Sequence, residues 1–251
     1  MTSAEGETGP VEDAVLGGRV RLLQPARGYR AAIDPVLLAA AVPAGRGQSV
    51  IDVGCGVGTA MLCLARRVAD VRVVGLDLQP EILGHARRNI ALNGFDDRAE
   101  ALEGDLLAPP PGLKSGGFDH VLANPPFLES GRGRSSPVAA KAAATVEGQA
   151  TLDDWLRFCV RMGGPRASVT VIHRADRLAD LLAAMTGRLG ALKVFPLWPA
   201  EGQPARRILV QGRKGSAAPL EVLPGLVLHR PDGAYTEPAE AILRHGGALA
   251  F

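Results

Sequence analysis

The chain has 251 residues, of which 47% are hydrophobic and 22% are charged. That composition is typical of a globular protein with a sizeable core and excludes disorder over most of the chain. The 28 basic and 26 acidic residues give a net charge of +2, which neither requires nor excludes a nucleic-acid partner. Aromatic residues make up only 4%, which argues against a base-stacking surface built from many rings.

No segment of the sequence has the pattern of a membrane anchor or a signal peptide. The longest apolar run, residues 36–44, is interrupted by Pro43 and falls short of the ~20 residues that a spanning helix needs. The acidic N-terminus lacks an apolar segment. Cys55, Cys63 and Cys159 form no Cys-x-x-Cys pair, so we expect a reduced, cytoplasmic protein.

The predicted elements alternate between strands and helices. Residues 1–15 are expected to form a flexible leader and residues 16–251 a single domain, which opens with a short hairpin at residues 17–23. Strands are expected at residues 50–53, 71–77, 99–105, 118–123, 168–172 and 207–211, and helices at residues 35–42, 59–69, 80–92, 152–160 and 176–185. Such alternation predicts an α/β fold with a parallel sheet and helices on both faces.

A glycine-rich turn follows the strand at residues 50–53. It runs Gly54-Cys55-Gly56-Val57-Gly58, preceded by Asp52 in the strand. Glycines let the backbone pass close to a ligand, and the helix that follows offers unpaired N–H groups. The third glycine comes one residue too early for the dinucleotide fingerprint Gly-x-Gly-x-x-Gly, which disfavours a dinucleotide-dependent oxidoreductase.

Two further acids follow the next two strands. Asp77 ends the second strand, where a carboxylate can accept both hydroxyls of a ribose. Asp105 ends the third strand and can accept a hydrogen bond from an adenine amino group. Together with the following Leu78 and Leu106, these acids complete the candidate cofactor site.

The fourth strand leads directly into Asn124-Pro125-Pro126-Phe127. The two prolines impose an extended bend and remove two N–H donors, so that carbonyls can point into a pocket. Asn124 adds a side-chain acceptor and Phe127 adds a flat ring. This set suits the binding of an exocyclic amino group attached to a planar ring.

The two motifs together resemble those of the class I S-adenosylmethionine-dependent methyltransferases, in the branch that methylates amino or amide nitrogens. The resemblance covers roughly residues 49–211. It implies a Rossmann-like fold with a mostly parallel seven-stranded sheet, S-adenosylmethionine as the cofactor, and catalysis by residues 124–127.

A narrower resemblance lies outside the central motifs. Residues 28–38, which include Arg30 and Asp34, are similar to the segment before the cofactor motif in the bacterial tRNA1(Val) adenine N6-methyltransferase family. Residues 228–236 are similar to the C-terminal end of some of its members. The family's target is the tRNA adenine just 3′ of the anticodon. Arg30 is therefore a candidate cofactor residue, although Arg30 and Asp34 could instead cap a helix.

With tRNA as the expected partner, four arginines become candidates for phosphate contacts: Arg132, Arg134, Arg206 and Arg207. The five histidines show no metal-ligand spacing, so we expect no metal. The sequence leaves open whether the protein is a monomer or a dimer.

Two other functions remain as alternatives. One is N5-glutamine methylation of a protein factor, but the 48 residues before Ser49 are too few for the helical domain that this family carries. The other is a non-catalytic RNA-binding protein that keeps the cofactor fold, which the intact motif at residues 124–127 argues against.

Overall fold

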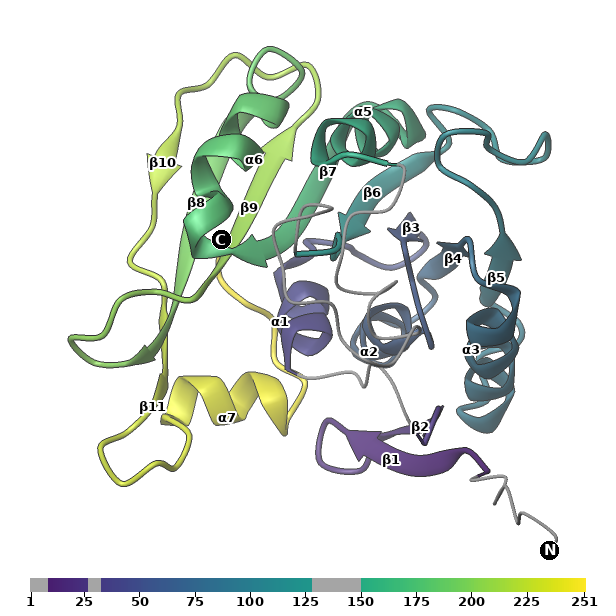
Figure 1. The fold of residues 1–251 in the computed structure, drawn as a ribbon, viewed down its shortest axis with the longest axis horizontal. Coiled ribbons are helices and arrows are strands. Elements are labelled where there is room, and N and C mark those ends of the chain that lie inside the picture. The colour runs from purple at the N-terminus through teal and green to yellow at the C-terminus, as the bar shows by residue number, and fades with distance from the viewer. Residues whose placement is uncertain (1–8, 27–32, 128–149) are drawn as a thin grey trace, which may run out of the picture.

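The structure, a computed structural model, describes residues 9–26, 33–127 and 150–251. Nine strands in this part of the chain form one sheet (Figure 1): β3 (Ser49–Val53), β4 (Arg72–Asp77), β5 (Ala99–Glu103), β6 (Phe118–Ala123), β7 (Gly163–Arg174), β8 (Gly190–Ala200), β9 (Arg207–Arg213), β10 (Glu221–Val222) and β11 (Leu226–His229). Their order is β10-β8-β9-β7-β6-β3-β4-β5, with β11 also paired to β8.

The seven central strands, β5-β4-β3-β6-β7-β9-β8, form the mostly parallel sheet that the sequence implied. All pairs from β5 to β7 are parallel, and only β9 runs antiparallel to its two neighbours. The strand order reverses between β3 and β6, because β4 lies on one side of β3 and β6 on the other. In open sheets of this kind, ligands bind outside the carboxyl ends of the strands at such a reversal.

Helices cover both faces of the sheet (Figure 1), as the sequence predicted. On one face α1 (Asp34–Ala41), α2 (Thr59–Arg67), α3 (Pro80–Leu92) and α7 (Glu237–Leu243) pack into one apolar cluster. On the other face α5 (Leu152–Met162) and α6 (Leu178–Met185) pack into a second. Pro residues start α1 and α3, and a reciprocal capping box of Thr151 and Asp154 starts α5.

The prediction of a flexible leader at residues 1–15 is wrong for residues 11–15. Val11–Val15 form β1, which pairs antiparallel with β2 (Val20–Gln24). This hairpin docks on α3 through Asn89, whose Oδ1 accepts the Leu23 N–H at 2.6 Å. Asn89 Nδ2 donates to the carbonyls of Leu23 and Val57, at 3.1 and 2.9 Å. The buried amide thus ties the hairpin to the glycine-rich turn.

The C-terminal part contains elements that the sequence analysis did not predict. These are β8, β10, β11 and α7. The two short strands β10 and β11 both pair with β8, and they extend the expected seven strands to nine within the described residues. Among these residues, no helix is long and apolar enough to cross a membrane.

Candidate active site

The glycine-rich turn is fixed to the end of β4. The N–H groups of Gly54 and Cys55 both donate to the Leu76 carbonyl, at 2.7 and 3.0 Å. Gly54 has a φ of +73°, and a Cβ there would lie 2.4 Å from Cη2 of Trp155. A Cβ on Gly56, by contrast, would meet no atom within 4 Å. The turn therefore packs against Trp155 on one side and leaves open space at Gly56.

Asp77 ends β4 and reaches back to this turn. Its Oδ2 accepts the Gly56 N–H at 2.8 Å, and its Oδ1 accepts the Gln79 N–H at 3.0 Å. Burial raises the pKa of Asp77, while these two N–H groups act in the opposite direction. Each carboxylate oxygen can accept a further hydrogen bond, so Asp77 can bind two neighbouring hydroxyls.

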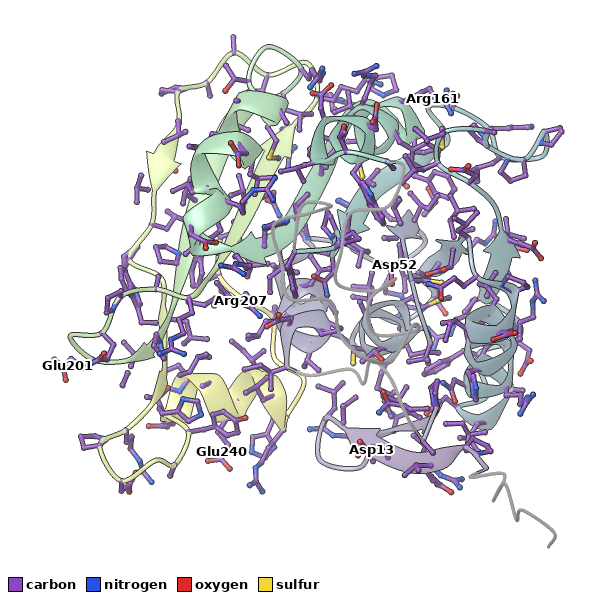
Figure 2. All side chains as sticks on the ribbon, in the orientation of Figure 1. Asp13, Asp52, Arg161, Glu201, Arg207 and Glu240 are labelled. Carbon is purple, nitrogen blue, oxygen red and sulfur yellow. The ribbon has the colours of Figure 1, made fainter. Side chains whose placement is uncertain are left out.

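Asp52 lies beneath the turn, near the centre of the molecule (Figure 2), and is almost fully buried. Its Oδ2 accepts the Met61 N–H in the first turn of α2, at 3.2 Å. Burial raises the pKa of Asp52 to about 7. The hydrogen bond from Met61 lowers this pKa, and the charge of Asp77 raises it by a smaller amount. Burial also raises the pKa of the adjacent Cys55 thiol, which makes it a protonated filler and not a nucleophile.

Asn124 to Phe127 follow β6 directly, across the strand reversal from the turn. The Oδ1 atom of Asn124 is buried and has no hydrogen-bond partner among the described residues. A buried acceptor without a partner carries a desolvation penalty that a bound donor would relieve. The motif is therefore prepared to accept an N–H from a ligand.

A single cavity of about 450 Å³ joins these elements. It is lined by twelve of the predicted site residues: Asp52, Gly54, Cys55, Gly56, Asp77, Leu78, Asp105, Leu106, Asn124, Pro125, Pro126 and Phe127. Gly58 does not line it but caps α2 with a φ of +87°. Arg30, Arg132 and Arg134 lie outside the described residues.

The two neighbouring arginines Arg206 and Arg207 differ in their surroundings. Arg206 is exposed, as a phosphate contact requires. Arg207 lies beside α1 (Figure 2), where its Nε donates to Oδ2 of Asp34 at 2.7 Å. Asp34 is the first residue of α1, whose N-cap is Ile33 without a side-chain hydrogen bond, so Asp34 does not cap the helix and pairs with Arg207 instead.

Two residues of the cavity wall that sequence reasoning did not assign to the site are notable, Thr59 and Trp155. Thr59 begins α2, and its buried hydroxyl has no hydrogen-bond partner within the described ranges. Trp155 also lines the cavity, although its spacing indicated only an apolar helix face. The close approach of its ring to Gly54 links two segments about 100 residues apart, which no local pattern reveals. No group of three or more potential metal ligands occurs in the part of the chain that is described.

The sheet order and this cavity define a class I methyltransferase. Enzymes of this class use S-adenosylmethionine as the methyl donor. Residues 32–146 match the methyltransferase small domain family. The structure is similar to that of a predicted O-methyltransferase from Agrobacterium tumefaciens, with a TM-score of 0.73 and 28% identity over 87% of this chain and 99% of that one.

The sequence is 30% identical to the tRNA1(Val) (adenine(37)-N6)-methyltransferase of Porphyromonas gingivalis, over 82% of this chain and 84% of that protein. The chain belongs to this family of methyltransferases. A release factor glutamine methyltransferase from Deinococcus radiodurans is 41% identical, but only over 39% of this chain and 30% of its own length.

Proposed function

We propose that the protein transfers the methyl group of S-adenosylmethionine to the exocyclic N6 of an adenine in tRNA, beside the anticodon. The observation that carries this proposal is Asn124, which lines the same cavity as the glycine-rich turn and whose buried Oδ1 has no hydrogen-bond partner in the described part of the chain. An acceptor in that environment requires a donor from the substrate, and an exocyclic amino group supplies two.

The cavity fits the cofactor by its chemistry. Asp77 binds the ribose hydroxyls with the acceptor capacity that Gly56 and Gln79 leave free. Asp105, whose Oδ1 already accepts the Leu107 N–H at 2.8 Å, binds the adenine amino group. Leu78 is 63% exposed at the cavity wall and covers the adenine ring. The buried Asp52 and the half-buried Asp77 complement the positive charge of the sulfonium.

S-adenosylmethionine supplies an electrophilic methyl carbon on a cationic sulfur and leaves as S-adenosylhomocysteine. Asn124 Oδ1 accepts one hydrogen of the substrate amino group, and the Pro125 carbonyl accepts the other. These bonds draw the nitrogen lone pair out of conjugation with the purine and direct it towards the methyl carbon. With the cofactor bound, its S–C bond would break as the N–C bond forms, and the substrate nitrogen would then release one proton to solvent.

Phe127 stacks on the extruded adenine. Extrusion from an anticodon loop costs little because the loop is single-stranded. Arg132, Arg134 and Arg206 contact phosphates of the RNA. Arg30 contacts the cofactor, as the resemblance implies. We expect the protein to act in the cytoplasm, where tRNA is used.

Glutamine methylation is the alternative that the site chemistry also accommodates, since a carboxamide carries two N–H donors like an exocyclic amine. The similarity to the glutamine methyltransferase is limited to less than half of either chain, whereas the tRNA enzyme matches most of both. The adenine substrate is therefore the better supported of the two.

The test is an assay with labelled S-adenosylmethionine and separate pools of tRNA, rRNA, DNA and protein, followed by digestion of whichever pool takes up label. The proposal predicts N6-methyladenosine from tRNA, and labelling about a hundredfold or more slower with an Asn124→Ala variant. Label in protein, recovered as methylglutamine, would overturn it.

A further inference from the structure

The ring of Phe127 is contacted from two sides by residues far away in the sequence. The guanidinium carbon of Arg207 lies over the ring, 4.6 Å from its centroid. The imidazole of His173 meets the ring edge-on, with centroids 5.5 Å apart and an interplanar angle of 87°. Both arrangements are favourable contacts of an aromatic ring.

Arg207 is held in this orientation by hydrogen bonds within the protein. Its Nε donates to Asp34 Oδ2 at 2.7 Å, and one terminal nitrogen donates to the Arg206 carbonyl at 3.2 Å. Asp34 is only 7% exposed, so loss of the arginine would leave a buried carboxylate without its partner. Two nitrogens of the guanidinium thus donate hydrogen bonds within the protein, which leaves Arg207 poorly suited to bind an RNA phosphate.

His173 makes the second contact with the ring, edge-on, and is uncharged at neutral pH. It is fully buried, and neither ring nitrogen has a hydrogen-bond partner within the described residues; the Pro126 carbonyl lies near the ring but outside hydrogen-bond geometry. Burial, together with the charge of Arg177, lowers the pKa of His173 to about 4. At neutral pH the ring of Phe127 therefore has one cation over a face and one uncharged imidazole in an edge contact.

We propose that Arg207, held by Asp34, is a positioning residue that fixes the ring of Phe127 for the target base. This inference rests on the proposed function for the identity of that base. The guanidinium covers one face of the ring, so the base stacks on the opposite face. The ion pair joins α1 to the start of β9, and the contact of Arg207 with Phe127 connects both to the catalytic loop after β6.

The first experiment separates positioning from phosphate binding. Arg207→Gln, Arg207→Lys and Asp34→Asn are assayed for kcat at saturating tRNA and cofactor, for affinity towards S-adenosylhomocysteine, and for the salt dependence of tRNA binding. We expect Arg207→Gln to lower kcat at least tenfold, with cofactor affinity and salt slope unchanged. Arg207→Lys keeps the charge but lacks the planar fork and recovers kcat only partly.

Arg213→Gln is the matched control, because it removes the same charge from the other, exposed end of β9. It is expected to leave kcat unchanged. If Arg207→Gln keeps the parental kcat and instead loses one contact's worth of salt dependence, Arg207 binds phosphate and the proposal is overturned. If Arg207→Gln fails to fold, Asp34→Asn takes its place in the kcat assay, because it removes the charge of the partner and keeps the size of the side chain.

A second experiment reads the ring directly and needs no RNA. The protein is labelled with 4-fluorophenylalanine, and the Phe127 signal among its six phenylalanines is assigned by its absence in Phe127→Leu. We expect Arg207→Gln and Asp34→Asn to shift this fluorine resonance, whereas Arg213→Gln does not. A resonance that stays in place in both variants contradicts the proposal. If the signal moves but no RNA is methylated by the parental protein, the proposed function fails while the contact between Arg207 and Phe127 stands.

Discussion

The carboxylate of Asp77 accepts the backbone N–H of Gly56, with 2.8 Å between Oδ2 and the nitrogen. This bond joins the end of β4 to the glycine-rich turn after β3, and it holds the turn open at one wall of the cavity. One side chain thus shapes the turn and offers the acceptors that the proposed cofactor needs.

Replacement of Asp77 by Ala should therefore weaken cofactor binding. A hydrogen bond to a charged group contributes ~1.5–3 kcal/mol, so we expect a loss of affinity of about tenfold to a hundredfold. Calorimetric titration with S-adenosylhomocysteine measures it, and the thermal shift that the ligand produces should shrink in parallel. Asp119→Ala is the control, since its carboxylate binds Ser49 at the opposite end of β3. An Asp77→Ala variant with parental affinity would refute this role.

Asn124→Ala should separate chemistry from cofactor binding. Its Oδ1 has no hydrogen-bond partner among the described residues, so little stability is lost, while the substrate amino group loses an acceptor that aligns it. We expect turnover to fall by about two to three orders of magnitude, as for other groups that act mainly in the transition state. Affinity for S-adenosylhomocysteine should not change. Methylation at the parental rate would mean that this side chain has no part in the reaction.

The stability of the cofactor-free protein should depend on the protonation of Asp52. Its pKa is raised to about 7 in the folded state, so the folded protein holds a proton that the unfolded chain has lost above pH ~4. The stabilisation is complete below that pH and is lost as the pH rises towards 7. In thermal or chemical unfolding, Asp52→Asn should remove this part of the pH dependence. An unchanged profile in the variant would argue against a protonated Asp52.

Cofactor affinity should show the opposite trend, because a cationic sulfonium favours the ionised carboxylate. Below pH 7, binding of S-adenosylmethionine must release the Asp52 proton, so affinity should rise by up to about tenfold per pH unit and level off above 7. Titrations between pH 5.5 and 8 measure this slope. Asp52→Asn should flatten it.

Asn89 and Asn93 form a matched pair for testing how the N-terminal hairpin is attached. Asn89 is fully buried and binds Leu23 and Val57, whereas the half-buried Asn93 binds the backbone of Arg21 and of Asn89. Asn89→Ala leaves buried backbone groups unpaired, at a cost of ~1–3 kcal/mol each. It should also weaken cofactor binding through Val57. Asn93→Ala should cost much less in chemical unfolding; equal losses would show that burial of the amide is unimportant.

The arginines proposed to bind RNA can be tested by salt titration. Replacing Arg132, Arg134 and Arg206 by Gln should weaken tRNA binding and reduce the slope of log Kd against log salt by up to about three contacts' worth. Affinity for S-adenosylhomocysteine should stay the same. A parental slope in this variant would remove these residues from the interface.

The sequence predicted most of the parallel half of the sheet because its strands are short apolar runs bounded by glycine or proline. It did not reveal β8, which contains Pro196 and Pro199. A proline cannot donate to a strand ladder, so such a run does not have the usual strand pattern. The helix α7 did carry a signal, since Thr236 accepts the Ala239 N–H and a proline follows within the first turn.

Twelve residues of the cavity wall were predictable because they lie at or directly after the ends of predicted strands. Contacts between distant segments were not. Arg207 was expected to bind RNA, and its pairing with Asp34 and Phe127 depends on how β9, α1 and β6 come together. His173 and Trp155 likewise acquire their neighbours, Phe127 and Gly54, only in the folded chain.

The most direct test of the account is methylation of a tRNA anticodon stem-loop that carries a single adenine just 3′ of the anticodon. After incubation with S-adenosylmethionine, the RNA is digested and its nucleosides are identified by mass spectrometry. We predict N6-methyladenosine with the parental protein, none when that adenine is replaced by guanine, and about a hundredfold less, or lower still, when Asn124→Ala is used. Methyl transfer to another nucleoside, or to a glutamine in a protein substrate but not to this RNA, would contradict the account.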